Sequence, residues 1–162
     1  GEGSLTYADG RSLVGEFKEG NIYTGTGVYT EANGDIYEGN WLEGVFNGQG
    51  KITYPDCNSI QGEFRQGKLY NGHGTQLQSN GDLYEGTWVD GNRGTGKLTY
   101  ASGNTVEGEF FCNGLLNKGT GRVHLKDGSI YEGSMDNGKF HGQGTLTQTN
   151  GTSVQGEFKN GK

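Results

Sequence analysis

The segment from Gly91 to Lys97 comes close to a phosphate-binding loop. It reads Gly-Asn-Arg-Gly-Thr-Gly-Lys, and such a loop holds phosphate groups with glycine amides and a lysine. The next residue of that motif is Ser or Thr, which binds Mg²⁺, but this chain has Leu98. The motif also opens a helix, whereas Leu98 and Tyr100 begin a predicted strand. We therefore do not expect nucleotide binding here.

Residues that bind metals or act as nucleophiles are scattered along the chain. His73, His124 and His141 lie far apart, and His73 and His141 each precede a glycine in a predicted turn. Cys57 and Cys112 have no partner histidine in a motif, and no set of ligands has the spacing of a zinc site. We expect no metal, no cofactor and no cysteine nucleophile. Two distant cysteines favour a reducing, cytoplasmic setting.

Carboxylates are the remaining catalytic candidates. Glu107 and Glu109 are two residues apart, on one face of a predicted strand. A glycosidase needs its carboxylate pair in a deep cleft, whereas exposed carboxylates on a strand are solvated and discourage aggregation at sheet edges. The sequence therefore predicts a protein that is not an enzyme.

The charge balance bears on the partners. The chain has 13 basic and 19 acidic residues, for a net charge of −6. Recognition of anionic lipid takes a cluster of about 4–8 Lys or Arg, and nucleic acid also requires a basic patch. Here the basic residues are scattered, and no stretch approaches the roughly 18 apolar residues of a membrane span. We expect neither nucleic acid nor membrane lipid as a partner of this chain.

A glycine-spaced motif recurs along the chain at intervals of 22 to 25 residues. A fixed period of this size is typical of a repeat protein, in which each unit packs mainly on its neighbours. We expect one array over residues 1–162, cut from a longer protein. The central glycine of the motif recurs at Gly15, Gly39, Gly62, Gly86, Gly108, Gly133 and Gly156. The expected boundaries are a half unit 1–10, units 11–34, 35–57, 58–81, 82–103, 104–128 and 129–151, and a partial unit 152–162.

Alternation within one repeat indicates a β-hairpin. Tyr37, Gly39 and Trp41 are spaced two apart, which places them on one face of a strand. The glycine-rich stretch from Gly44 to Gly50 is expected to form the turn, and the alternation resumes at Ile52. No segment has sustained helical periodicity. The predicted fold is all-β: an elongated, single-layer, twisted antiparallel sheet of tandem β-hairpins.

Glycines outside and inside the strands have separate roles. Asn-Gly and Asp-Gly pairs, such as Asn33-Gly34, predict tight turns with positive backbone angles between hairpins. Cys57 replaces this glycine once, so we expect either a somewhat strained backbone there or a turn of another type. The glycosylation triplet Asn150-Gly151-Thr152 aligns with the same turn. Because glycine weakens a strand, we expect Gly39 to leave a hollow that a neighbouring aromatic ring fills.

Two types of unit alternate. Units that begin Tyr-Glu-Gly start at Tyr37, Tyr84 and Tyr131, at intervals of 47 residues. In the units between them an aliphatic residue replaces this tyrosine: Leu13, Ile60, Val106 and Val154. A duplicated two-repeat ancestor would explain the alternation, and so would a surface that presents its aromatic groove every second repeat.

These residues resemble the MORN repeat (membrane occupation and recognition nexus). Its pattern, Tyr-x-Gly-x-Trp-x-x-Gly-x-x-x-Gly-x-Gly, is followed from Tyr37 to Gly50. The aliphatic residues in alternate units, and Met135 in place of Trp, keep the apolar face but thin its aromatic groove. The resemblance implies a rod-like hairpin array used as a scaffold. Members of the family bind proteins, self-associate and have been linked to membrane and phosphoinositide binding, in some cases as modules attached to enzymes.

The aromatic face is the candidate binding site, and two interpretations stay open. The rings form only a thin core, or some stay exposed as a groove for a partner helix or peptide. We expect a non-catalytic scaffold that binds a protein partner there, with a regulatory or membrane- or phosphoinositide-targeting module of a larger enzyme as the alternative. The expected groove residues are Tyr37, Trp41, Tyr54, Tyr84, Trp88, Tyr100 and Tyr131.

The last strand of the array is a second candidate surface. The segment from Ser153 to Phe158 has no following strand, and unpaired strand edges are templates for another chain. We expect a weak homodimer through this edge, with Val154 and Phe158 in the contact, although Glu157 and Lys159 oppose edge pairing. The expected location is the cytoplasm, with attachment to the cytoskeleton or to membranes through partners.

Overall fold

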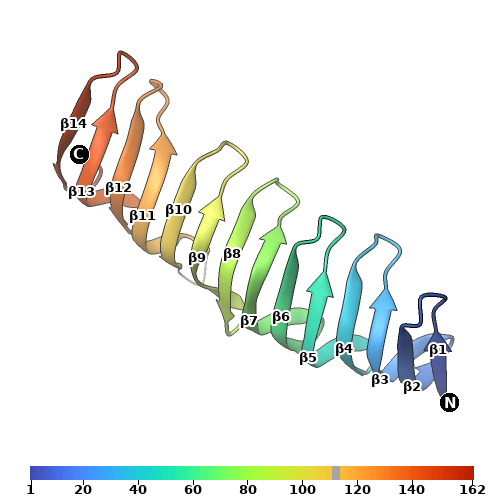
Figure 1. Cartoon of the computed structure of the whole chain (residues 1–162). Helices are drawn as coiled ribbons and strands as arrows, with labels where there is room; N and C mark the ends of the chain where they lie inside the picture. Colours follow the sequence, from blue (N-terminus) through green and yellow to red (C-terminus); the bar gives the residue numbers. More distant parts are fainter. Residues whose placement is uncertain (111–113) are drawn as a thin grey trace. The chain divides into compact units, whose positions relative to one another are not determined.

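A computed structural model describes residues 1–110 and 114–162, so the expectation for Cys112 lies outside the described residues. The described residues form fourteen β-strands and no helix. Consecutive strands are neighbours in one antiparallel sheet, as Figure 1 shows. The predicted all-β sheet of tandem hairpins is therefore confirmed. None of the described residues belongs to a helix that is long and apolar enough to cross a membrane.

The chain divides into two compact units. The first contains residues 1–76 and 88–91, and the second contains residues 77–87 and 92–162. The strands that lie wholly or mostly in the first unit are β1 (Glu2–Thr6), β2 (Ser12–Lys18), β3 (Asn21–Thr30), β4 (Ile36–Leu42), β5 (Val45–Thr53), β6 (Ser59–Arg65) and β7 (Lys68–Leu77). Those of the second are β8 (Leu83–Val89), β9 (Asn92–Thr99), β10 (Thr105–Phe110), β11 (Leu116–His124), β12 (Ile130–Asp136), β13 (Lys139–Thr147) and β14 (Ser153–Phe158).

A two-residue turn joins β4 to β5. Glu43 and Gly44 have φ angles of 53° and 79°, and a turn with two positive φ angles matches the twist of the flanking strands. Leu42 pairs with Val45 directly beside the turn. The stretch from Gly44 to Gly50, predicted to be the turn, is therefore mostly strand. That prediction was wrong because two residues are enough to reverse the chain here.

Asn-Gly and Asp-Gly pairs lie in longer loops at the other ends of the strands. Gly34 has a φ of 93°, and the side-chain oxygen of Asn33 accepts a hydrogen bond from the backbone N–H two residues on, at 3.0 Å. This local bond is the reason for Asn or Asp there, and Asn150 makes it too, at 2.9 Å. Cys57 takes the glycine position with a φ of 68°, so the expected backbone strain is confirmed.

Strand glycines leave room for aromatic rings. Gly39 pairs with Gly50 across β4 and β5. A Cβ atom on Gly39 would stand 2.8 Å from Cζ of Phe46 and 2.7 Å from Cα of Gly50. A side chain at Gly39 would therefore displace the ring of Phe46. The predicted hollow filled by a neighbouring ring is confirmed at this position.

The register between paired strands alternates along the chain. In one type of hairpin the strand glycine pairs with the first glycine of the next strand, and in the other type it pairs with the second. Pairs of the first type are Gly15–Gly25, Gly62–Gly72 and Gly108–Gly119. Pairs of the second type are Gly39–Gly50 and Gly133–Gly144. The two types of repeat found in the sequence therefore differ in backbone pairing as well as in side chains.

Candidate partner-binding face

Within each unit, buried apolar side chains alternate with exposed ones along the strands, so they gather on one face, which we call the apolar face. In the first unit the buried side chains are Leu13, Ile22, Trp41, Phe46, Ile52, Ile60, Phe64, Leu69 and Trp88. In the second unit they are Tyr84, Leu98, Val106, Phe110, Leu116, Tyr131 and Met135. Because the sheet is a single layer, this face is both the core and the surface on which a partner would find apolar groups.

Aromatic rings on the apolar face of the first unit contact one another, edge to face in every pair below except the tilted pair of Trp41 and Tyr37. The Trp41 ring lies 5.6 Å from Tyr29, 6.1 Å from Tyr37 and 5.5 Å from Phe46, measured between centroids. The rings of Phe46 and Phe64 are 4.6 Å apart. Aromatic pairs of this geometry contribute about 0.5–1.5 kcal/mol each beyond their buried area. These contacts between rings therefore stabilise the thin core of the first unit.

Two tyrosines of the second unit are fully buried. The Tyr84 hydroxyl donates to the Thr87 carbonyl at 3.0 Å, and the Tyr131 hydroxyl donates to the Ser134 carbonyl at 2.7 Å. Burial raises the pKa of both hydroxyls, and Arg93 acts in the opposite direction on Tyr84. Neither ring has exposed surface. Both tyrosines therefore belong to the buried part of the apolar face.

The predicted groove residues fall into two groups. Tyr37, Tyr54 and Tyr100 are half-buried, and burial raises the pKa of each hydroxyl. The other four are buried: Trp41 and Trp88 are 9% exposed, and Tyr84 and Tyr131 are 0% exposed. The rings that a partner can reach directly are therefore the three half-buried tyrosines.

A cavity of about 340 Å³ lies on the apolar face of the first unit. Its lining brings together three of the predicted groove residues, Tyr37, Tyr54 and Trp88. Gln76 also lines it, and its Nε2 donates a hydrogen bond to the Tyr54 hydroxyl at 2.9 Å. Of the described residues that line it, Lys68 alone is charged. The cavity offers ring edges, a fixed amide and one cation to a ligand.

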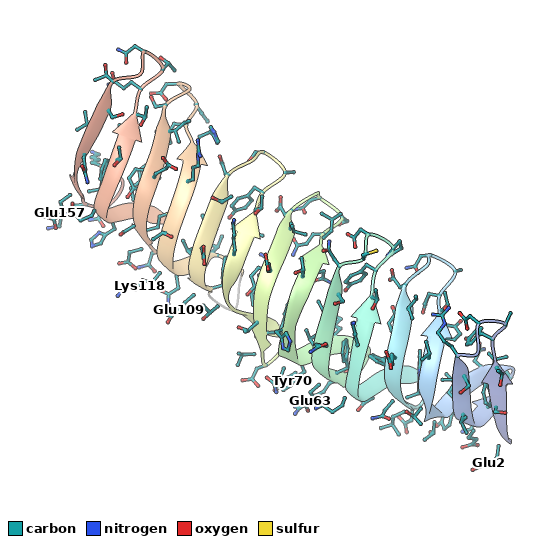
Figure 2. All side chains as sticks on the ribbon, viewed as in Figure 1. Glu2, Glu63, Tyr70, Glu109, Lys118 and Glu157 are labelled. Atoms are coloured by element: carbon teal, nitrogen blue, oxygen red, sulfur yellow. The ribbon has the colours of Figure 1, made fainter. Side chains whose placement is uncertain are left out.

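The opposite face of the first unit is polar. Near the short turn between β6 and β7, where Figure 2 labels Glu63 and Tyr70, the Arg65 guanidinium lies 3.6 Å from the centroid of the Tyr70 ring. Arg65 pairs with Glu63 at 2.7 Å. Hydrogen bonds from Arg65 and then from Asn71 lower the pKa of Glu63. Solvent screens an ion pair as exposed as this one, so this cluster is mainly a solvated surface.

The residues with catalytic potential stay apart. The segment that resembles a phosphate loop is strand β9, and Arg93 within it lies 4.9 Å from the centroid of the Tyr84 ring. His73 and His141 lie in strands β7 and β13 instead of the predicted turns, and both are exposed. No three His, Cys, Asp or Glu side chains gather as a metal site among residues 1–110 and 114–162.

Sequence reasoning missed Arg93 as a neighbour of the buried tyrosine. It stands two residues after Gly91, as Phe46 stands two residues after Gly44. That alignment of the repeats could have predicted that Arg93 lies on the apolar face. It shows that a cation replaces an apolar side chain at one position of the repeat.

Tandem glycine-rich hairpins, with an apolar face in each unit, define a repeat protein. The sequence model of the MORN repeat matches residues 37–56, 61–83, 84–105 and 131–153, which is more than half of the chain. The chain therefore belongs to the MORN repeat family, as the resemblance implied.

Other comparisons add little. One similar solved structure is the SAS-4 (dCPAP) TCP domain of Drosophila melanogaster in complex with a proline-rich motif of Ana2 (dSTIL). It has 14% sequence identity and a TM-score of 0.35, covering 96% of this chain and 77% of that chain. A likeness of this size supports no argument about function. A search of curated protein sequences finds no match.

Proposed function

We propose that this chain is a non-catalytic scaffold that binds a protein partner through its apolar face. The observation that carries the proposal is the cavity of about 340 Å³ lined by Tyr37, Tyr54 and Trp88. Half-buried aromatic rings around a hollow are the surfaces on which binding hot spots form.

The partner of this face is a helix or an extended peptide. Such a segment inserts successive apolar side chains into a groove, and its backbone stays near the solvent. The half-buried tyrosines have hydroxyls that hydrogen-bond at the rim, while their rings contact apolar groups. We place the scaffold in the cytoplasm, attached to the cytoskeleton or to membranes through its partners. The free, exposed thiol of Cys57 accords with a reducing compartment.

Direct targeting to phosphoinositide, as a module of a larger enzyme, is the alternative. The net charge of −6 and the scattered basic residues weigh against it. We therefore favour the protein partner.

The test begins with a pull-down that uses the 162-residue chain as bait, followed by titration of each purified candidate. Tyr37→Ala is expected to weaken binding about tenfold or more, as for a hot-spot ring. Glu38→Ala is the matched control, because Glu38 is the next residue, is exposed and lies on the opposite face. Equal affinities for the two variants, with both folded, would place the contact elsewhere.

A further inference from the structure

A second cavity lies on the apolar face of the second unit. Its volume is about 450 Å³, and its lining includes Val106, Leu116, Val123 and Met135. Val106, Leu116 and Met135 are at most 6% exposed, so the base of the cavity is apolar. Lys139, at the start of β13, is the one charged side chain among the described residues of the lining.

The register of the strands explains why this cavity exists. In the first unit Tyr29 pairs with Tyr37, and Trp41 lies opposite Gly25. In the second unit the equivalent pairs are Val123 with Tyr131 and Met135 with Gly119. The tyrosine is thus kept, as Tyr37 in one unit and Tyr131 in the other. Met135 takes the place of an indole ring, and Val123 takes the place of a phenol ring. Two side chains that fill the face in one unit are missing from the other.

We propose that this cavity is an anchor site that takes an aromatic side chain of the partner, next to a partner carboxylate. The inference rests on the proposed function, because it names the chemistry of one segment of that partner. The partner ring would occupy the space that Trp41 fills in the first unit.

The chemistry of the lining supports this occupant. A methionine side chain is flexible and polarisable, and its sulfur makes favourable contacts with aromatic rings. The carboxylate follows from Lys139. Asp136, its neighbour across the turn, accepts a hydrogen bond from Asn137 Nδ2 at 3.0 Å, and no ion pair holds Lys139 within the described residues. Its ammonium group is therefore available to an anionic group beside the ring.

The first experiment uses indole-3-propionate as the probe, since it joins an indole ring to a carboxylate. The chain contains a single methionine, so ¹³C-methyl labelling of Met gives one NMR signal, from the cavity floor. We expect this signal to shift saturably with the probe. Indole-3-propionamide, which lacks the charge, is expected to bind about two- to fivefold more weakly, which is the range of an exposed ion pair. The acid should bind the Lys139→Ala variant more weakly by the same factor.

Lys97→Ala is the matched control. It removes a cation from the same unit, but Lys97 is exposed and precedes Leu98, which is on the apolar face. The Kd of the probe should not change. A methyl signal that does not move at any probe concentration overturns the site. Equal affinities for the acid and the amide overturn the carboxylate.

The second experiment fills the cavity. Met135→Trp restores the indole found at the equivalent position of the first unit, and ligand-observed saturation transfer from the probe should be lost. With an identified partner, this variant should raise Kd at least tenfold while a thermal melt shows an intact fold. If the partner binds but Met135→Trp binds it equally well, the anchor site is wrong and the scaffold function stands. If the variant does not fold, the Lys139→Ala and amide comparisons still decide the question.

Discussion

Replacing Phe64 by alanine tests whether the aromatic floor carries the stability of the first unit. Phe64 has no exposed surface, and its ring lies 4.6 Å from that of Phe46. Truncation of a buried phenylalanine to alanine costs about 3–5 kcal/mol of unfolding free energy. Phe158 occupies the same place in the last repeat, but it is half-buried. Phe158→Ala should therefore cost about 1–2 kcal/mol, part of the value for full burial.

A double-mutant cycle isolates the contact between the two rings. Phe46→Ala removes the other partner of the 4.6 Å pair. If the edge-to-face geometry contributes, the double variant should be less destabilised than the sum of the single variants by about 0.5–1.5 kcal/mol. A coupling energy near zero would mean that burial alone accounts for the stability.

Urea unfolding, followed by tryptophan fluorescence, is the assay. Trp41 reports on this region because its ring lies 5.5 Å from Phe46. Circular dichroism recorded on the same samples shows whether the whole sheet unfolds together, since arrays of repeats do not always unfold in two states. The reasoning is refuted if Phe64→Ala costs less than about 1 kcal/mol, or no more than Phe158→Ala.

Three further predictions concern binding. Trp41→Ala and Trp88→Ala should each weaken partner affinity by about 1–4 kcal/mol in titration calorimetry. Folding is checked by thermal melt, because both side chains are only 9% exposed. Unchanged affinity in both folded variants would contradict the groove. Liposomes rich in phosphoinositide should retain little of the chain at physiological salt, given its net charge of −6, and strong, salt-sensitive sedimentation would favour lipid targeting instead. Light scattering at high concentration should detect a weak homodimer through β14, where Val154 is 55% exposed; Val154→Lys should remove it, and a strict monomer of the unchanged protein would show that the edge is protected.

The sequence alone was sufficient to predict the architecture, because each repeat combines large aromatic residues and glycine at alternate positions of a strand. Tyr37, Gly39 and Trp41 can share a strand face only if the glycine makes room, and Phe46 is the ring that uses the room. The extent of the turns could not be predicted in the same way. Glycine is common both in turns and between close-packed strands, so the stretch from Gly44 to Gly50 had two explanations, and hydrogen bonding across the hairpin decided between them.

Which aromatic rings are reachable also depends on contacts that the sequence does not contain. Tyr84 and Tyr131 have the same residue type and motif position as Tyr37. They are nevertheless fully buried, each beside another ring, Phe110 for Tyr84 and Phe140 for Tyr131, and each hydroxyl donates to a carbonyl three residues on along its own strand. Tyr37 is only half-buried. Equivalent residues of the repeat therefore differ in burial with their local packing and hydrogen bonds, which the motif alone does not specify.

The alternating register has a consequence for anyone who shortens or lengthens this array. The pairing between successive hairpins does not alternate, because the second glycine of one hairpin pairs with the central glycine of the next in both types, as in Gly27–Gly39 and Gly50–Gly62. Excision of a single repeat would therefore keep this pairing but place two hairpins of the same type side by side. Excision of residues 37–83 would instead let Tyr84 take the place of Tyr37, the start of the same type of repeat. A library of designed binders that keeps the order of the two hairpin types is therefore spliced in steps of two repeats, whereas single-repeat steps change that order without changing how hairpins join.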